Sequence, residues 1–169
     1  MKITALEEYG LRCLLHVARG GENQATSAQF VSDKEGLSLP YTQKILRILS
    51  KGGLIRARRG VHGGYVLTRP VEEISMGDTM RVLGGMIDVE EMCERYTGEL
   101  PQCSHGCGCV IKPVWTHISN FVVRTLDAVS IATLLNDTKE LEAYLNSMTS
   151  ETKPVNNPSI LETSSPLEL

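Results

Sequence analysis

Apolar residues recur at helical spacing near the start of the chain, and glycines interrupt the pattern. The first predicted helix begins at Thr4, because T-A-L-E can form a capping box with Glu7, and it ends at Gly20-Gly21. Its inward face carries the residues Leu6, Tyr9, Cys13, Leu14 and Val17. We therefore expect Cys13 to be a core residue.

Two further helices follow, with a tight turn between them. The second starts after Thr26-Ser27 and ends at Gly36, a residue type favoured just after a helix C-terminus. The third starts at Ser38, which can cap it, has Pro40 in its first turn and ends at Gly52-Gly53. Its inward face carries Ile45, Leu46 and Leu49. This order predicts a helix-turn-helix.

Residues 54–58 and 65–68 are typical of two β-strands on either side of the sequence RGVHGG. A hairpin in this place makes the predicted fold a winged helix-turn-helix. A glycine-rich loop can instead cradle the phosphates of a nucleotide. The contexts required for that, G-x-x-x-x-G-K-S/T or strand-G-x-G-x-x-G-helix, are absent from this sequence.

The second half of the chain predicts one short and one long helix. Ser75 caps a helix that has Asp78 in its first turn and ends at Gly84-Gly85. Residues 114–135 form the longest predicted helix, whose apolar stripe consists of Val114, Ile118, Val122, Leu126 and Val129. Such a stripe packs either against the same helix of a second subunit, in a homodimer, or against its own chain.

The formal net charge of −3 hides a strong asymmetry. Residues 1–70 contain 11 Lys and Arg against 5 Asp and Glu, whereas residues 71–169 contain 6 against 15. A basic half joined to an acidic half indicates that the basic half binds a polyanion. Chance partition of surface charge is the alternative.

The third predicted helix and the hairpin carry residues suited to double-stranded DNA. Lys and Arg neutralise phosphates, while amide, hydroxyl and guanidinium groups near a helix N-terminus contact base edges in the major groove. Glycines let the hairpin approach closely. The candidate DNA-binding residues are Ser38, Pro40, Tyr41, Thr42, Gln43, Lys44, Arg47, Lys51, Arg56, Arg58, Arg59, His62, Gly63, Gly64 and Tyr65. For the helix, a merely solvated polar face is the alternative.

The predicted fold class is mainly α with a small β-hairpin wing, that is, a winged helix-turn-helix with a long dimerisation helix. Residues 1–70 form the predicted DNA-binding domain, and residues 71–137 hold the short helix, a cysteine-rich loop and the long helix. Residues 138–169 are expected to contain a short helix and a tail, disordered from Thr149 onward because Ser, Thr, Pro and Asn dominate it.

Four of the five cysteines lie within residues 93–109, here called the cysteine segment, together with His105. No secretory signal pattern and no run of about 18 apolar residues is present, so we expect a cytoplasmic protein without membrane spans. In a reducing cytosol, clustered cysteines favour metal binding or redox chemistry over a permanent disulfide framework.

Several kinds of chemistry fit these thiols. One is an iron–sulfur cluster, of the 2Fe–2S or 4Fe–4S type. Another is zinc held by Cys93, Cys103, Cys107 and Cys109, although the last two lie closer than a usual C-x2-4-C pair. A metal-free switch would oxidise Cys107 with Cys109 or Cys103. A thiol oxidoreductase is a remote alternative, because such enzymes carry C-x-x-C in a βαβ pattern, and we expect no enzyme.

Three segments carry a resemblance: KITALEEYGLRCLLHVA, GLSLPYTQKILRILSKGGLIRARRGVHGGYVLTRP and CVIKPVWTHISNFVVRTLDAVSIATLL. They resemble the Rrf2 transcription regulators, the IscR- and NsrR-like winged-helix dimers of bacteria, over roughly residues 1–137. The resemblance implies a homodimeric repressor on a palindromic promoter operator. In many members three loop cysteines hold an iron–sulfur cluster whose state changes operator affinity; others lack the cluster and respond to a partner protein or another signal.

Carried over residue by residue, the resemblance matches Cys109 to the last loop cysteine, with Cys103 at the family spacing C-x5-C before it. The first cysteine of the family would fall at Thr97, so Cys93 is the expected substitute and Cys107 is its rival. These residues are the candidate metal ligands.

Two further positions concern a fourth ligand. Lys112 stands where some members have a histidine ligand, so that ligand is absent here, and Glu8 stands where others provide an acidic residue from the first helix. In a dimer Glu8 could reach the loop of the other subunit. The implied mechanism is a coupling in which the cluster reshapes its loop against the long helix and thereby changes how two winged helices fit paired half-sites.

Overall fold

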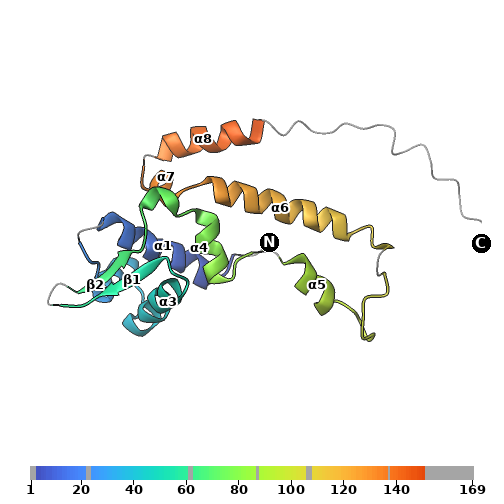
Figure 1. Cartoon of the computed structure of the whole chain (residues 1–169), viewed down its shortest axis with the longest axis horizontal. Coiled ribbons are helices and arrows are strands. Elements are labelled where there is room, and N and C mark those ends of the chain that lie inside the picture. Colours follow the sequence, from blue (N-terminus) through green and yellow to red (C-terminus); the bar gives the residue numbers. More distant parts are fainter. Residues whose placement is uncertain are drawn as a thin grey trace, which may run out of the picture.

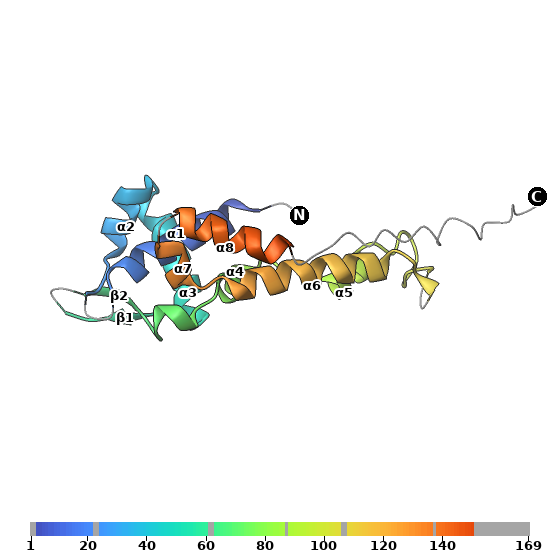
Figure 2. The same cartoon turned by 90° about the horizontal axis from the view of Figure 1, so that it is seen from above.

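The computed structural model describes residues 3–21, 24–60, 63–86, 88–105, 108–136 and 138–150. A compact body of helices and a hairpin lies at one end, and a long helix extends from it with a short helix near its far end (Figure 1). The elements are α1 (Ala5–Arg19), α2 (Ala28–Glu35), α3 (Leu39–Lys51), β1 (Ile55–Arg58), β2 (Gly64–Leu67), η1 (Val71–Glu73), α4 (Met76–Leu83), α5 (Val89–Arg95), α6 (Lys112–Ala128), α7 (Ile131–Leu135) and α8 (Thr138–Ser150). Figure 2 shows the same elongated arrangement from above.

Helix α1 is the centre of the body. It begins with the predicted capping box, in which Thr4 accepts from the Glu7 amide and Glu7 accepts from the Thr4 amide. Its apolar side packs with α3 and with residues of η1 and α7 in one core. The fully buried side chains of this core include Leu14, Ile45, Leu46, Leu49, Ile55, Ile74 and Ile131. Cys13 is fully buried as well, which confirms it as a core residue.

The helix-turn-helix and the wing are confirmed. Gly36 ends α2 in the left-handed conformation, with φ 64°, and α3 follows after two residues. Strands β1 and β2 pair antiparallel, with Ile55 opposite Leu67 and Arg58 opposite Gly64. The predicted capping by the Ser38 side chain is wrong, because that hydroxyl makes no cap hydrogen bond. Pro40 in the first turn needs no amide acceptor, so α3 starts without it.

The predicted continuous helix over residues 114–135 is wrong, because it divides into α6 and α7. At the break, the Met76 amide donates to the Val129 carbonyl and the Ile131 amide donates to the Ile74 carbonyl, both at 2.7 Å. These two bonds require extended backbone, and the Ser130 side chain then caps α7. The chain therefore leaves α6 at Ala128 and returns to the core, where Ile131 is fully buried.

The cysteine segment was expected to be a loop, yet α5 carries Cys93 within a helix. Asp88 caps α5 by accepting from the Glu91 amide at 2.8 Å. The predicted short helix after residue 137 is α8, which extends to Ser150 and so includes residues 149 and 150, which were assigned to the tail. The rest of the predicted tail lies outside the described residues. Within the described ranges, no helix combines the length and the apolar character that a membrane crossing requires.

Burial raises the pKa of the Cys13 thiol to about 12, with a smaller contribution from the negative charge of Glu35. Only the thiolate reacts with alkylating agents, so Cys13 will stay unmodified in the native protein at pH 8.5. We expect native alkylation of the metal-free protein, followed by peptide mass spectrometry, to find Cys93, Cys103 and Cys109 modified and Cys13 intact. Alkylation in denaturant serves as the control and must modify all four. Native modification of Cys13 at the rate of Cys103 would contradict the burial.

Candidate functional site

One side of α3 is polar and exposed, opposite the side that carries Ile45, Leu46 and Leu49. Together with the arginines of the wing it forms a surface that we call the basic surface. Its residues on α3 are Pro40, Gln43, Lys44, Arg47 and Lys51, and those at the wing are Arg56, Arg58 and Arg59. All of these residues are exposed, and Ser38 lies exposed at the start of the helix. Four of the five α3 residues, and all three arginines, can contact a polyanion through side-chain donors.

Two predicted contact residues of α3 are placed differently. Thr42 is fully buried, and its hydroxyl donates to the Ser38 carbonyl at 3.2 Å. Its prediction as a DNA-binding residue is wrong, because residue 42 shares the inward face with residues 45, 46 and 49 at helical spacing. Tyr41 is half-buried and packs edge-on against the Tyr9 ring, with ring centres 6.3 Å apart. Only part of Tyr41 remains for an external contact.

The wing is fastened to the body through Tyr65. The Tyr65 and Thr26 backbones exchange two hydrogen bonds of 2.9 Å, and the Tyr65 side chain packs against the core. A Cβ atom on Gly64 would lie 2.5 Å from the Thr26 carbonyl oxygen. Gly64 and Tyr65 were expected to contact DNA, whereas both are half-buried and make contacts inside the chain. Gly63 is also half-buried, and His62 lies outside the described residues.

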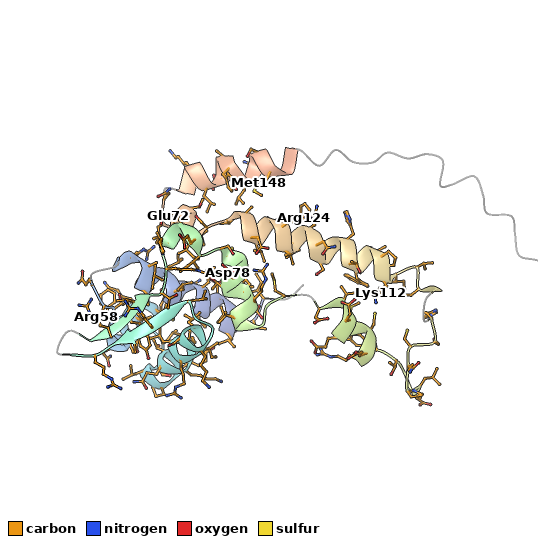
Figure 3. All side chains as sticks on the ribbon, in the orientation of Figure 1. Arg58, Glu72, Asp78, Lys112, Arg124 and Met148 are labelled. Carbon is orange, nitrogen blue, oxygen red and sulfur yellow. The ribbon has the colours of Figure 1, made fainter. Side chains whose placement is uncertain are left out.

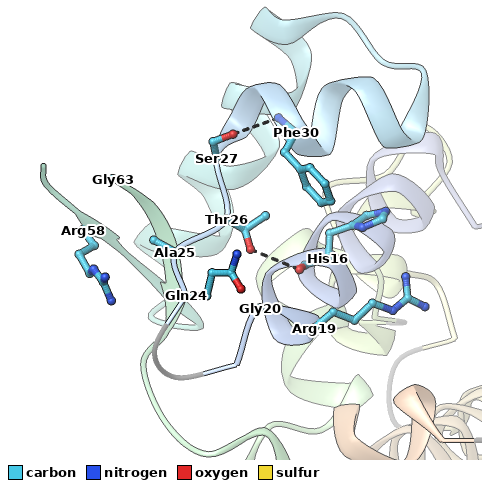
Figure 4. Close-up of a pocket in the computed structure, with 10 residues that line it drawn as sticks. All are labelled: His16, Arg19, Gly20, Gln24, Ala25, Thr26, Ser27, Phe30, Arg58 and Gly63. Atoms are coloured by element: carbon cyan, nitrogen blue, oxygen red, sulfur yellow. Dashed lines mark hydrogen bonds between the residues drawn. The ribbon is translucent and has the colours of Figure 1, made fainter. Parts of the chain in front are cut away.

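A cleft of about 710 Å³ lies between α1, the start of α2 and the wing. Its lining includes two arginines on opposite sides, Arg19 and Arg58, and the neighbouring rings of His16 and Phe30 (Figure 4). His16 is held by Glu35 through a 2.6 Å contact between Nε2 and Oε1. The sequence reasoning missed Arg19, because the α1 pattern was interpreted only for its apolar face. Its exposed guanidinium adds positive charge beside the wing.

The cysteine segment lies at the far end of α6 from the wing (Figure 1). Cys93 on α5, Cys103 in the following connection and Cys109 just before α6 are free thiols, and each is half-buried. Cys107 lies outside the described residues. Among the described residues, no three Cys, His, Asp or Glu side chains gather closely enough to hold a metal ion.

The start of α6 contacts both Cys109 and α5. The Lys112 amide donates to the Cys109 Sγ at 3.3 Å, an N–H to sulfur bond of the kind that stabilises a ligating thiolate. The Lys112 ammonium lies 3.5 Å from the Glu90 carboxylate of α5. Figure 3 labels Lys112 at the end of α6 that lies over α5. Lys112 thus connects the two helices of this end.

Glu8 is exposed on α1 and paired within its own chain. Its carboxylate lies 2.7 Å from the Arg12 guanidinium, and this hydrogen bond raises the pKa of Arg12. The Glu8 carboxylate therefore has to break its ion pair with Arg12 before it can serve as a metal ligand elsewhere.

Large apolar side chains are exposed along one side of α6 and just before it. The predicted apolar stripe is only partly exposed. Val129 is buried, whereas the side chains of Val114 and Ile118 are exposed by 56% and 38%. We call the exposed set the α6 stripe; it consists of Val110, Ile111, Val114, Trp115, Ile118 and Phe121. A contiguous apolar surface of this kind marks an interaction site.

A helix-turn-helix followed by an antiparallel wing, with a basic surface across both, defines a winged-helix DNA-binding protein. The sequence profile described as Rrf2, iron-dependent transcriptional regulator, matches residues 3–137. The chain belongs to the Rrf2 family and is a DNA-binding transcriptional regulator, in a family of regulators that are not enzymes.

Individual relatives agree with this assignment. The chain is 32% identical to the protein rrf2 of Nitratidesulfovibrio vulgaris over 137 residues, which cover 81% of this chain and 89% of that protein. Among solved structures, it is similar to T. potens IscR, with TM-score 0.64, 27% identity and coverage of 84% and 91% of the two chains. It is also similar to CymR, the global cysteine regulator of B. subtilis, with TM-score 0.63, 27% identity and coverage of 81% and 99%.

Proposed function

We propose that this protein is a homodimeric repressor that binds a palindromic promoter operator and responds to the state of its cysteine segment. The observation that supports the first part is the basic surface, which runs from the exposed side of α3 onto the wing. A bacterial chromosome lies in the cytoplasm, so this is where the protein would act.

In the proposed complex, α3 enters the major groove with its N-terminal end. Ser38, Gln43 and Lys44 would contact base edges, because their donors and acceptors are exposed near that end. Phosphates would be contacted by Arg47, Lys51 and the three wing arginines. These contacts neutralise the phosphate charge and carry no sequence information. Pro40 and the exposed edge of Tyr41 would flank the bases, and Gly63 would let the wing approach the backbone.

The proposed dimer is formed by the α6 stripe. A two-fold axis places the same surface on both subunits, so one apolar side of a long helix is sufficient for a self-complementary contact. The bodies at the two ends of such a dimer would present two α3 helices to paired half-sites about one helical turn apart. Burial of Trp115, Ile118 and Phe121 in this contact would remove the largest exposed apolar side chains of α6 from water.

The proposed sensing element is an iron–sulfur cluster held by Cys93, Cys103 and Cys109, with Cys107 and Glu8 as further candidates. The donor chemistry fits, since three free half-buried thiols lie at the same end of α6 and Cys109 already accepts an amide hydrogen bond. The described cysteines would have to move closer to one another to bind one cluster. When bound, such a cluster supplies sensitivity to oxidants and to iron supply.

A second candidate is a cofactor-free thiol switch, and zinc binding by the same cysteines is a third. The observation that favours the switch is that the described thiols are free and do not converge. Oxidation of Cys109 would remove the sulfur acceptor from the start of α6, where the Lys112 amide now donates.

The roles within the basic surface can be tested by gel shift and anisotropy titrations over a range of salt. Arg59→Ala should weaken binding to every duplex and reduce the slope of log K against log salt by about 1. Gln43→Ala should instead change the preferred base pair, by about 1–3 kcal/mol. Lys139→Ala on α8 removes one positive charge away from both this surface and the cysteine segment and should bind as wild type. Equal losses on every sequence for Arg59→Ala and Gln43→Ala would contradict the division of roles.

The cluster is tested by anaerobic purification with iron, sulfide and zinc analysis and a visible spectrum. Wild type should be coloured, and Cys103→Ala and Cys109→Ala should lose both iron and colour. Cys13→Ala should keep them, because a buried protonated thiol is no ligand. Colourless wild type containing zinc would replace the cluster by zinc. Wild type free of both metals, but with oxidant-dependent operator binding, would favour the thiol switch.

The dimer is tested by placing a charge within the α6 stripe. Ile118→Glu should yield monomers in analytical ultracentrifugation at micromolar concentration, because the carboxylate would be desolvated in the contact. His117→Glu adds a carboxylate at an exposed neighbouring position of α6 and should remain dimeric. If Ile118→Glu sediments as wild type does, the two subunits do not meet through this surface.

A further inference from the structure

Helices α4 and α6 cross at very close range near the C-terminal end of α6. A Cβ atom placed on Gly77 would collide with the Asp127 carboxylate and would lie 3.2 Å from the Asp127 backbone nitrogen. Only glycine at position 77 allows this approach. The same crossing contains the two backbone hydrogen bonds that join residues 74–76 to residues 129–131. We call this crossing the α4–α6 joint.

A chain of ion pairs runs across the joint. Arg81 Nη2 lies 2.6 Å from Oδ1 and 2.5 Å from Oδ2 of Asp127, and Arg81 Nη1 lies 3.3 Å from Asp78 Oδ1. Asp78 in turn accepts from Arg69 Nη2 at 2.7 Å. The hydrogen bond with Asp127 raises the pKa of the Arg81 guanidinium, so this residue remains charged under all ordinary conditions. The chain of four residues thus joins α6 to the exit of the wing.

One end of α4 contacts α3, and the other contacts Arg69, two residues after the end of β2. Val82 fills the space beside Gly52 at the end of α3, where a Cβ atom would collide with it. Arg69 directly follows Thr68, whose hydroxyl donates to the Leu54 carbonyl at 3.1 Å beside the first strand of the wing. A displacement of α4 would therefore move both α3 and the wing.

These ion pairs contribute little to stability. The side chains are exposed by 41% and 35% in the Arg69–Asp78 pair and by 44% and 40% in the Arg81–Asp127 pair. Exposed pairs contribute little to stability, far less than the burial of Ile74 and Ile131 beside them. These ion pairs instead affect geometry. The two arginines and their carboxylate partners fix the orientation of α4 relative to α6 and to the exit of the wing.

We propose that Arg81 and Asp127 are positioning residues that hold α6 at a fixed angle to the winged helix and transmit changes at the cysteine segment to the wing. The inference rests on the proposed response to the state of that segment. Helix α6 is 17 residues long, about 25 Å, and Cys109 lies just before its far end. A reorientation of α6 would be transmitted to the DNA-binding body through the α4–α6 joint, where Asp127 contacts Arg81.

The test uses the full chain in two states, prepared anaerobically and after exposure to oxidant. The readout is the ratio of the operator dissociation constants of the two states. Asp127→Asn and Arg81→Gln should each bring this ratio closer to one by about threefold or more. Because both substitutions break the Arg81–Asp127 pair, the double variant should resemble Arg81→Gln, which also removes the contact of Arg81 with Asp78. Melting temperatures should stay within about 3 °C of wild type, as expected for exposed pairs.

Glu72→Gln is the matched control, since it removes one exposed carboxylate from η1 and leaves the ion-pair chain intact. Its ratio should equal that of wild type. A second readout needs neither DNA nor sensing: hydrogen exchange at the Met76 and Ile131 amides should accelerate about twofold or more in Asp127→Asn and stay unchanged in Glu72→Gln.

An affinity ratio in Asp127→Asn equal to that of Glu72→Gln overturns the positioning role. If wild type itself shows a ratio of one, the proposed response to the cysteine segment is wrong. Hydrogen exchange then tests only the positioning role at the α4–α6 joint. Unchanged exchange in Asp127→Asn would reject Asp127 as a positioning residue in that case too.

Discussion

The burial of α1 against α3 is the constraint on which the basic surface depends. Leu14 of α1 and Leu46 and Leu49 of α3 are fully buried in the same core. Each such side chain contributes about 1.5–3 kcal/mol, whereas an exposed ion pair contributes about 0–1 kcal/mol. Burial therefore decides how α3 is rotated. Once its apolar side is fixed inward, Lys44 and Arg47 face outward, where a nucleic acid can reach them.

The same core also holds the C-terminal half of the family domain. Ile131 of α7 and Ile74, just before α4, are fully buried beside α1. The backbone bonds between residues 74–76 and 129–131 then set where α6 leaves the body. Consequently the long helix is attached firmly at one end, while its other end extends away with α5 beside it (Figures 1 and 2).

The cysteine segment differs from this firm body in its contacts. In α5 only Val89 is buried, and one of the contacts between α5 and α6 is the exposed ion pair of Glu90 with Lys112. A region with few buried apolar side chains has low local stability and rearranges at small energetic cost. This property suits the proposed role of the thiols, which would have to come together to bind a metal or to oxidise.

The sequence by itself determined the local elements of the body. Capping residues such as Thr4 and Ser75, the terminating Gly36 and the apolar spacing in α1 and α3 are local signals, so the helix-turn-helix and the wing were predicted. Most of the basic surface followed from the same spacing. Thr42 was misassigned because its hydroxyl was given more weight than its position among residues 45, 46 and 49, although helical spacing alone places it inward.

Tertiary structure decided the remaining features, because they depend on residues distant in sequence. The apolar spacing continues past Val129, but backbone bonds to Ile74 and Met76 end α6 there. Gly64 and Tyr65 were predicted to contact DNA because they belong to a glycine-rich hairpin. In the structure both lie against Thr26 instead. Likewise, the contact of Arg81 with Asp127 has no local signal, because only the packing of α4 on α6 brings those charges together.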